Sequence, residues 1–274
     1  MRTLRVPGSD VAISQLGLGC ARMFGGRELP QAARLLESAL KHGITHFDTA
    51  PAYGSEAVLG TVLAGCAVTI TTKVGLPRYQ ASSSTARRVL GPLYRRTARG
   101  LLSRVPGLKA RLLKAAAAPV QSNVMPRRRL GRGEVLAELE VSLKQLRRSS
   151  IDLYLLHEPN SIELTDELEG VFAELKHAGI IKAYGLAFGG GATAVAFGTV
   201  VQARAPIELR ERPGEHLCIS HGIIRGASER KGIPALMADT LRSSPGRAVI
   251  FSASSPHQIR HIATECDGGP VSPS

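Results

Sequence analysis

The sequence predicts an α/β fold, a (β/α)8 TIM barrel of eight parallel strands with helices between them. Short β-branched runs alternate with stretches of helical periodicity, which is typical of βαβ units and a parallel sheet. The 274 residues match the size of one barrel domain, and a hydrophobic content of 43% allows a large core. We therefore expect residues 1–274 to form a single barrel domain.

Eight apolar runs are the candidate strands, and several of them end on a polar residue. Their spacing leaves room for a helix or a loop after each strand. The expected strands are Gln15–Cys20, Ile44–Asp48, Val68–Lys73, Ile151–His157, Lys182–Ala187, Thr199–Ala203, His216–Ser220 and Ala248–Ser252.

Helical periodicity is clearest in four stretches between these strands. Leucines at three- and four-residue spacing predict helices over 31–42 and 134–146, and a third helix begins at Thr165. Gly43 follows the first of them, at the place where a left-handed glycine commonly ends a helix. A further helix is expected over 256–264.

Three parts of the chain depart from a regular barrel. Residues 78–132 form an insertion after the third strand, rich in Arg, Leu and Ala, for which we expect one to three short amphipathic helices. Glycines at 189–191 and prolines at 206 and 213 predict shortened fifth and sixth helices. The tail, residues 267–274, is rich in Gly, Pro and Ser and is expected to be disordered.

The formal net charge of +13 is concentrated in the insertion. No acidic residue lies between Glu56 and Glu134, whereas this interval is rich in arginine and lysine. Such a field attracts anionic substrates, polyanions or anionic membrane surfaces, unless the insertion is only a solvated basic cap. Aromatic residues make up 4% of the chain, and the insertion holds only Tyr79 and Tyr94, so a nucleic-acid partner is not expected. The arginines suggest instead that a small-molecule substrate is anionic.

The cysteines and the apolar segments predict a cytoplasmic protein. The four cysteines, Cys20, Cys66, Cys218 and Cys266, are far apart and show neither metal-ligand spacing nor the density of a secreted disulfide scaffold. No stretch approaches the roughly 20 apolar residues of a membrane span, and the first residues lack a signal peptide's apolar run. We expect a reducing compartment, no metal and no membrane span.

Three polar residues end neighbouring predicted strands. Asp48, Lys73 and His157 terminate the second, third and fourth strands. Active sites of parallel barrels gather at the C-terminal ends of the strands, so these side chains are expected to converge. Tyr53 follows Asp48 in the loop Thr-Ala-Pro-Ala-Tyr-Gly and is close enough in sequence to join them.

These four residues suit carbonyl reduction or its reverse. Reduction requires a proton donor for the carbonyl oxygen, and a free tyrosine, with a pKa of about 10, is a weak acid at neutral pH. The ammonium of Lys73 is expected to lower the pKa of Tyr53. Asp48 would hold Lys73 by an ion pair, and His157 would orient or polarise the carbonyl. Each residue alone has an ordinary structural explanation, but their shared place at strand ends favours a catalytic role.

The segments around these residues resemble the aldo-keto reductases. The resemblance rests on Gly43-Ile-Thr-His-Phe-Asp-Thr-Ala-Pro-Ala-Tyr-Gly54, on Thr-Thr-Lys73, and on Ser142-Leu-Lys-Gln-Leu with Ile-Asp-Leu-Tyr-Leu-Leu-His157. All four members of that family's catalytic tetrad fall on matching residue types. The resemblance extends over most of the chain outside the insertion and the tail.

The resemblance implies NADPH, or less often NADH, bound extended across the barrel mouth without a Gly-rich phosphate loop. The start of helix 256–264 suits phosphate, because free N–H groups and the helix dipole converge there. The residues that the resemblance assigns to the cofactor are Gly19 and Cys20 near the nicotinamide, Gln202 at the carboxamide, and Ser252, Ser254 and Gln258 at the adenosine phosphates.

Several positions depart from the family pattern. Ala187-Phe188 replaces a Ser-Asn pair that holds the nicotinamide amide, and the seventh strand has no tyrosine to stack on the nicotinamide, so His221 or Phe188 would have to substitute. Gln258 and Ile262 stand where an Arg and an Asn commonly meet the 2′-phosphate. The choice between NADPH and NADH therefore stays open.

Three functions are compatible with these observations. The first is an NAD(P)H-dependent oxidoreductase that reduces an aldehyde or ketone, or runs the reverse reaction. The second is a catalytically weak barrel that binds nicotinamide nucleotide as a sensor or scaffold, and the third is a polyanion-binding protein that acts through the insertion. Neither the substrate nor the oligomeric state is specified by these patterns. The complete tetrad favours the oxidoreductase.

Overall fold

The computed structural model describes one compact unit, which is built from Met1–Tyr79 and Leu130–Ser274. Within the chain it describes residues 1–21, 29–79, 130–160, 163–189, 197–204, 215–223 and 232–267. The expected helices of the insertion, the fifth and sixth helices and nearly all of the tail lie outside the described residues.

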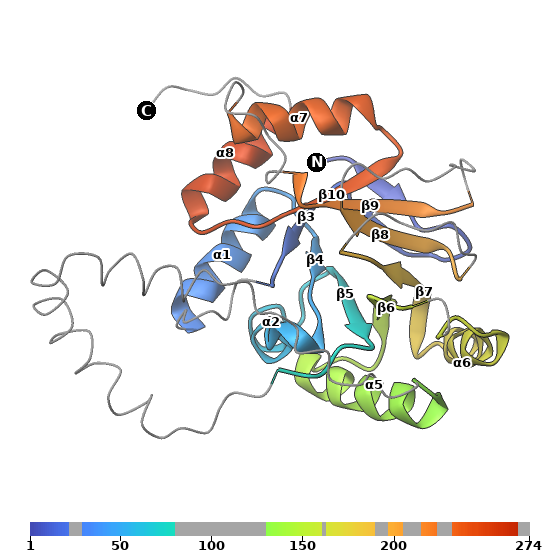
Figure 1. Cartoon of the computed structure of the whole chain (residues 1–274). Coiled ribbons are helices and arrows are strands. Elements are labelled where there is room, and N and C mark those ends of the chain that lie inside the picture. The colour runs from blue at the N-terminus through green and yellow to red at the C-terminus, as the bar shows by residue number, and fades with distance from the viewer. Residues whose placement is uncertain are drawn as a thin grey trace, which may run out of the picture. The chain divides into compact units, whose positions relative to one another are not determined.

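Eight parallel strands close into a barrel, and helices surround it (Figure 1). The strand order around the barrel follows the chain, and the last strand pairs with the first. The predicted fold class is confirmed, and each predicted strand matches an observed one to within two residues. The strands are β3 (Leu16–Gly19), β4 (His46–Asp48), β5 (Thr69–Val74), β6 (Ile151–His157), β7 (Ile181–Ala187), β8 (Val200–Arg204), β9 (Leu217–His221) and β10 (Arg247–Phe251).

The helices that the periodicity predicted are present, with the ends that the sequence indicated. Gly43 has a φ of 73° and its N–H donates to Leu40 O at 3.0 Å, which ends the first helix. The Thr165 side chain accepts a hydrogen bond from the Leu168 N–H and begins a later helix. The helices are α1 (Leu29–Lys41), α2 (Glu56–Val62), α5 (Arg132–Leu146), α6 (Asp166–His177), α7 (Ile233–Ser243) and α8 (Pro256–Cys266).

An N-terminal hairpin, β1 (Thr3–Arg5) with β2 (Ala12–Ser14), was not predicted, and neither were α2 and α7. The hairpin lies at the N-terminal ends of the barrel strands, because Thr69 Oγ1 donates to Ala12 O at 2.9 Å. Val6 and Ile13 belong to the same buried cluster as residues inside the barrel. The hairpin therefore closes that end of the barrel with apolar side chains.

Two apolar clusters follow from the alternation of side chains along each strand. The larger one lies between the strands and the helices and contains Phe47, Tyr154 and Phe172. The smaller one fills the barrel interior and contains Leu155 and Ile219. The interior cluster draws mainly on β6 to β10, so the interior side of β3 to β5 is left for small and polar residues.

A neutral histidine fills part of this polar side. His46 is completely buried, and its Nε2 lies 2.9 Å from Thr71 Oγ1. Burial lowers the pKa of His46 to about 4, so the ring is uncharged at neutral pH. A β-carbon added at Gly17 would lie 2.7 Å from His46 Nδ1, so the glycine makes room for the ring. Because His46 lies two residues before Asp48 on β4, it occupies the interior layer next to the predicted site.

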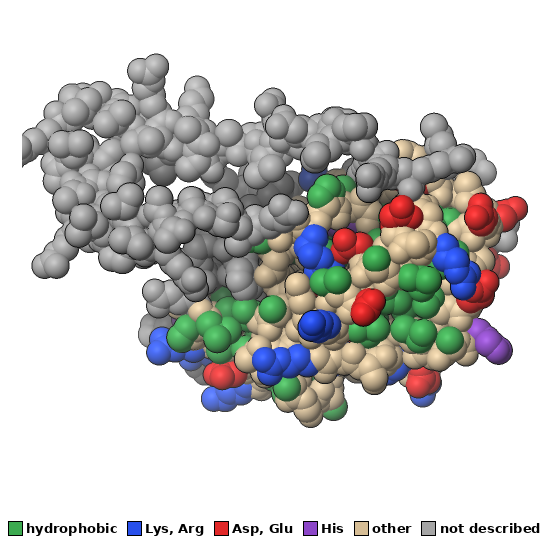
Figure 2. Space-filling model, turned by 90° about the horizontal axis from the view of Figure 1, so that it is seen from below, with side chains coloured by type: hydrophobic (Ala, Val, Ile, Leu, Met, Phe, Trp, Pro, Cys, Tyr) green, Lys and Arg blue, Asp and Glu red, His purple; other side chains and the backbone are tan. Residues whose placement is uncertain are grey.

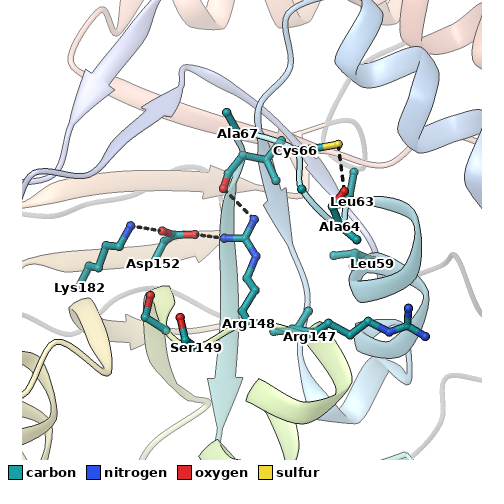
Figure 3. Close-up of a pocket in the computed structure, with 14 residues that line it drawn as sticks. Leu59, Leu63, Ala64, Cys66, Ala67, Arg147, Arg148, Ser149, Asp152 and Lys182 are labelled. Carbon is teal, nitrogen blue, oxygen red and sulfur yellow. Dashed lines mark hydrogen bonds and ion pairs between the residues drawn. The ribbon is translucent and has the colours of Figure 1, made fainter.

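An ion-pair network joins the starts of three strands at the closed end of the barrel (Figure 3). Asp152 Oδ2 accepts from the Ile70 N–H and from Arg148 Nη1, both at 2.9 Å, and Lys182 Nζ lies 3.0 Å from Oδ1. The same arginine donates to Val68 O at 3.0 Å. The network borders a hollow of about 450 Å³. Its position at the N-terminal ends of the strands indicates a structural role.

Acidic and basic side chains are interspersed on the face of the barrel that is seen from below (Figure 2). The excess of positive charge in the sequence lies instead in the interval without acidic residues, between Glu56 and Glu134. No helix within the described ranges combines the length and the apolar character that a membrane span requires.

The crossing of α2 and α5 gives a test of the packing. A β-carbon added at Gly60 would lie 2.2 Å from Gln145 O, so the helix backbones touch at this glycine. We expect Gly60→Ala to lower the free energy of unfolding by about 1–3 kcal/mol through overpacking. Gly170→Ala in α6, where nothing lies within 4 Å, should instead raise it by about 0.5–1 kcal/mol. Urea unfolding of both variants checks this, and equal effects would contradict the close crossing.

Candidate active site

The strand ends bring the predicted residues to one end of the barrel. Asp48 and His157 are the last residues of β4 and β6, and Lys73 lies one residue before the end of β5. In the parallel register, Asp48 pairs with Thr71 and Lys73 pairs with Leu155. All three side chains are nearly or fully buried. The geometry thus joins residues that are up to 109 positions apart in the chain, from 48 to 157.

A buried ion pair forms the centre of the site. Lys73 Nζ donates to Asp48 Oδ1 at 2.5 Å and to Thr49 O at 2.8 Å. The exposed fractions of the two side chains are 1% for Lys73 and 6% for Asp48. Burial alone would lower the pKa of Lys73, but the neighbouring Asp48 and Tyr53 raise it above its ordinary value. The lysine therefore carries its charge inside the barrel at neutral pH.

The loop that carries Tyr53 is fixed at both ends. It forms a single 3-10 turn, η1 (Pro51–Tyr53), which ends at Gly54 with a φ of 68°. The Tyr79 N–H donates to Pro51 O at 3.0 Å, and the Tyr79 ring leaves no room for a β-carbon at Gly54. On the other side, Thr49 Oγ1 lies 2.6 Å from Ser55 Oγ. The phenol is therefore presented by a short, hydrogen-bonded turn.

The Tyr53 side chain meets both of its predicted partners. Lys73 Nζ lies 5.1 Å from the centre of the Tyr53 ring. Tyr53 OH lies 3.4 Å from His157 Nε2, and the two rings stand edge to face with centroids 5.6 Å apart. The structure thus brings together the four residues that the sequence singled out.

The pKa of Tyr53 is raised overall, although Lys73 acts to lower it as expected. Burial is the largest cause and disfavours the phenolate, and the charge of Lys73 acts in the opposite direction without cancelling it. The Asp48 and Glu158 charges raise the pKa of Tyr53 further. Burial thus outweighs the field of the ammonium, so Tyr53 stays protonated at neutral pH and is available to donate its proton.

A cavity of about 360 Å³ opens beside this site. Asp48 and Tyr53 line one part of it, and residues at or just after the ends of β3, β8, β9 and β10 line the rest. The lining residues beyond the tetrad are Gly19, Ala21, Gln202, Arg204, His221, Gly222, Ile223, Ile250, Phe251 and Ser252.

Three of the six residues predicted to contact a cofactor line this cavity: Gly19, Gln202 and Ser252. Gln202 is buried, and among the described residues its Oε1 has no hydrogen-bond partner. Ser252 Oγ lies 3.5 Å from Gly19 O. The cavity therefore offers an unpaired buried acceptor in the position where the resemblance places a carboxamide contact.

The other three predicted cofactor residues lie elsewhere. Cys20 is completely buried, and burial raises the pKa of its thiol far above the usual range, so the thiol stays protonated. Ser254 and Gln258 lie on the exposed surface at the start of α8, where Ser254 N and Oγ both donate to Gln258 Oε1 at 2.7 and 2.8 Å. Ser255 caps the helix by accepting from the Gln258 N–H.

Residues that the sequence did not single out also shape the site. Arg204 lines the cavity two residues after Gln202 on β8, a spacing that places both side chains on the same face of the strand. Buried Glu56 accepts from Thr72 Oγ1 at 2.7 Å and pairs with Arg78, which links α2 to the strand that carries Lys73. Strand alternation was a signal that could have found Arg204, whereas the Glu56 contact depends on the folded chain.

Of the two aromatic candidates for the missing stacking tyrosine, only one lines the cavity. His221 is a lining residue, and its Nε2 lies 2.8 Å from Phe188 O. Phe188 is buried and belongs to the cluster between the strands and the helices.

Comparison with known proteins agrees with this geometry. Residues 15–193 match the model of the aldo/keto reductase family. The aldo-keto reductase YhdN of Bacillus subtilis (strain 168) is 26% identical over 194 residues, which are 68% of this chain and 46% of that protein. The chain thus matches about half the length of this curated relative.

Solved structures share the fold along nearly the whole chain. A putative aldo-keto reductase of Pseudomonas aeruginosa, PA4992, has a TM-score of 0.67 at 24% identity, covering 97% of this chain and 95% of that one. The holo form of aldo-keto reductase AKR11C1 from Bacillus halodurans has a TM-score of 0.66 at 19% identity, covering 99% and 93%. With the four residues assembled and the family model matched over most of the chain, the protein belongs to the aldo/keto reductase family.

Proposed function

We propose that the protein reduces an aldehyde or ketone to an alcohol with NADPH, with NADH as the alternative donor, and that Tyr53 is the general acid. One observation carries the proposal. A protonated tyrosine lies between a histidine, 3.4 Å from its hydroxyl, and a buried lysine that is ion-paired with Asp48. This arrangement lies at the edge of a cavity large enough for a small substrate.

The four side chains have separate tasks in reduction. Tyr53 donates its proton to the carbonyl oxygen as that oxygen gains negative charge. Lys73 then stabilises the phenolate that remains, and Asp48 holds Lys73 in place and keeps it charged. His157, next to the phenol, hydrogen-bonds the carbonyl oxygen and orients it. Solvent returns the proton to Tyr53 after the alcohol leaves.

The cavity residues fit a nicotinamide nucleotide. A bound reduced nicotinamide nucleotide would supply the hydride for the carbonyl carbon, while Tyr53 supplies the proton. Gln202 would bind the carboxamide through its unpaired Oε1, which can accept from the amide NH2. Gly19 packs closely against β10, since a β-carbon there would lie 2.9 Å from Ile250 Cγ2. His221, which lines the cavity, would face the ring in place of the missing tyrosine.

The proposal also includes a cytoplasmic location and roles for the remaining residues that are expected to contact the cofactor. All four cysteines lie in the described residues and carry free thiols, which suits a reducing cytoplasm. Ser254 and Gln258, at the start of α8, would meet the adenosine phosphates after their mutual hydrogen bonds rearrange. Cys20, whose side chain is fully buried, would only pack near the nicotinamide and make no polar contact with it.

Replacement of the acid tests the function. Tyr53→Phe should lower kcat for NADPH-dependent reduction of an aldehyde panel by about 10²–10⁴-fold, because general acid catalysis is lost. Tyr184→Phe is the matched control, since its hydroxyl contacts Glu169 on the outer side of the barrel. Steady-state NADPH oxidation is the measurement. Turnover that Tyr53→Phe leaves unchanged would exclude this mechanism, and a wild type without turnover that still binds NADPH would indicate a sensor.

The raised pKa of Tyr53 predicts the pH dependence of reduction. A general acid works in its protonated form, which persists below the pKa and is lost as the pH rises through it. Since the pKa of Tyr53 lies above its ordinary value, the rate of the reduction step should stay level through neutral pH and fall only above about pH 10. Single-turnover NADPH oxidation between pH 6 and 11 measures this. A fall centred near pH 7 would show that the acid has a lowered pKa or is another group.

A further inference from the structure

A second cation lies at the mouth of the cavity, apart from the buried lysine. Arg204 is the last residue of β8, and its side chain lines the cavity with Asp48, Tyr53 and His221. The burial along β8 changes from buried at Gln202 to exposed at Arg204. Strand β8 therefore places the Gln202 amide inside the cavity and the Arg204 guanidinium at its rim.

The Arg204 side chain is held against the neighbouring strand end. A β-carbon added at Gly222 would lie 3.2 Å from Arg204 Cγ and 3.7 Å from Cδ and Nε. Gly222 has a φ of 73°, a conformation that side chains disfavour, so the chain uses a glycine where the arginine stem crosses it. In the barrel register Arg204 pairs with His221, which immediately precedes this glycine. The guanidinium thus extends from a packed stem.

The charge of Arg204 is not neutralised by the described part of the chain. None of the ion pairs or hydrogen bonds between described residues involves its guanidinium. Asp48 is the one carboxylate among the lining residues, and it is already paired with Lys73. Arginines at such places commonly bind carboxylate or phosphate through two parallel hydrogen bonds. The cavity mouth therefore carries a positive charge that a ligand can neutralise.

We propose that Arg204 binds an anionic group of the carbonyl substrate, so that the preferred substrates are small aldehydes or ketones that carry a carboxylate or phosphate. This inference rests on the proposed function, because the reacting carbonyl must lie at Tyr53 while the anion reaches Arg204. Arg204 of the described barrel, and not the basic insertion, is then the residue that determines substrate specificity.

The same anion chemistry could come from the phosphates of the cofactor. Gln202 and Arg204 are neighbours on one face of β8, and Gln202 is assigned to the nicotinamide end. A phosphate-binding role would change the affinity for NADPH, whereas a substrate role would change only the preference among substrates. The two sources are therefore separated by measuring both quantities on the same variant.

The experiment compares matched charged and neutral substrates. We would measure kcat and KM with NADPH for 3- and 4-carboxybenzaldehyde and for the corresponding carbamoylbenzaldehydes, in the wild type and in Arg204→Gln. The wild type should prefer at least one carboxylate over its amide by about tenfold or more in kcat/KM, mainly through KM, because a charged hydrogen-bond pair is lost with the amide. In Arg204→Gln that ratio should approach one, and in Arg204→Lys it should be intermediate. Raising the salt from 0.1 to 1 M, which shortens the screening length from about 10 to 3 Å, should reduce the wild-type ratio.

The control removes an equal charge from the other end of the barrel. Arg147 is exposed beside the hollow at the closed end (Figure 3), so Arg147→Gln should leave the substrate preference unchanged. A ratio that Arg204→Gln leaves unchanged, or that Arg147→Gln alters equally, would overturn the inference. A weaker Kd for NADPH in Arg204→Gln with an unchanged ratio would assign the residue to the cofactor instead.

A binding measurement separates this inference from the proposed function. The affinities of 4-(hydroxymethyl)benzoate and 4-(hydroxymethyl)benzamide for the NADP⁺-loaded protein can be measured by calorimetry without turnover. Tighter binding of the benzoate that depends on Arg204 would support anion recognition even if no aldehyde were reduced. Equal binding of the two compounds to the wild type would refute it, whatever the activity.

Discussion

The buried ion pair between Lys73 and Asp48 is the interaction on which the site depends. Two charges inside a protein lose their hydration, and each ion must recover that free energy from close partners. Lys73 does so through Asp48 and Thr49 O, and the carbonyl comes from the loop that leads to Tyr53. The pair thus fixes the loop as well as the charge. Removing either partner would leave an unpaired ion inside the barrel, which is expected to destabilise the fold as well as the chemistry.

The barrel architecture explains why these groups can be buried together. Its interior is apolar on the side of β6 to β10, whereas β3 to β5 contribute glycines, threonines, a neutral His46 and the ion pair. Burial alone shifts the pKa values of the two groups in opposite directions: it lowers the pKa of Lys73 and raises the pKa of Tyr53. The lysine stays charged because of Asp48, and the tyrosine stays protonated because burial disfavours its phenolate more than the lysine's charge favours it. The site is consequently built to supply a proton to an oxygen that gains charge.

The barrel and the convergence of the four strand-end and loop residues could be predicted from the sequence, because both depend on local patterns. Apolar runs ending in polar residues define the strand ends, and parallel strands necessarily bring those ends together. The errors have equally physical causes. The hairpin β1–β2 is too short for a clear periodic signal, and the net direction of the Tyr53 pKa depends on burial, which periodicity does not report. The burial of the Cys20 thiol is equally invisible in the sequence, since Gly19 and Ala21 on either side of it line the cavity. Contacts such as Arg204 against Gly222 join distant segments and become visible only in the folded chain.

Transfer of isotope from the cofactor tests the central claim most directly. The claim is that a proton donor and a hydride donor meet at one carbonyl in the cavity beside Tyr53. An aldehyde should be incubated with NADPH deuterated at C4, using each of the two stereoisomers in turn, and the alcohol analysed by mass spectrometry and NMR. The account predicts one deuterium on the carbinol carbon with one stereoisomer, and little product from the Tyr53→Phe variant. Alcohol without deuterium from either stereoisomer, or labelled alcohol formed equally fast by that variant, would contradict it.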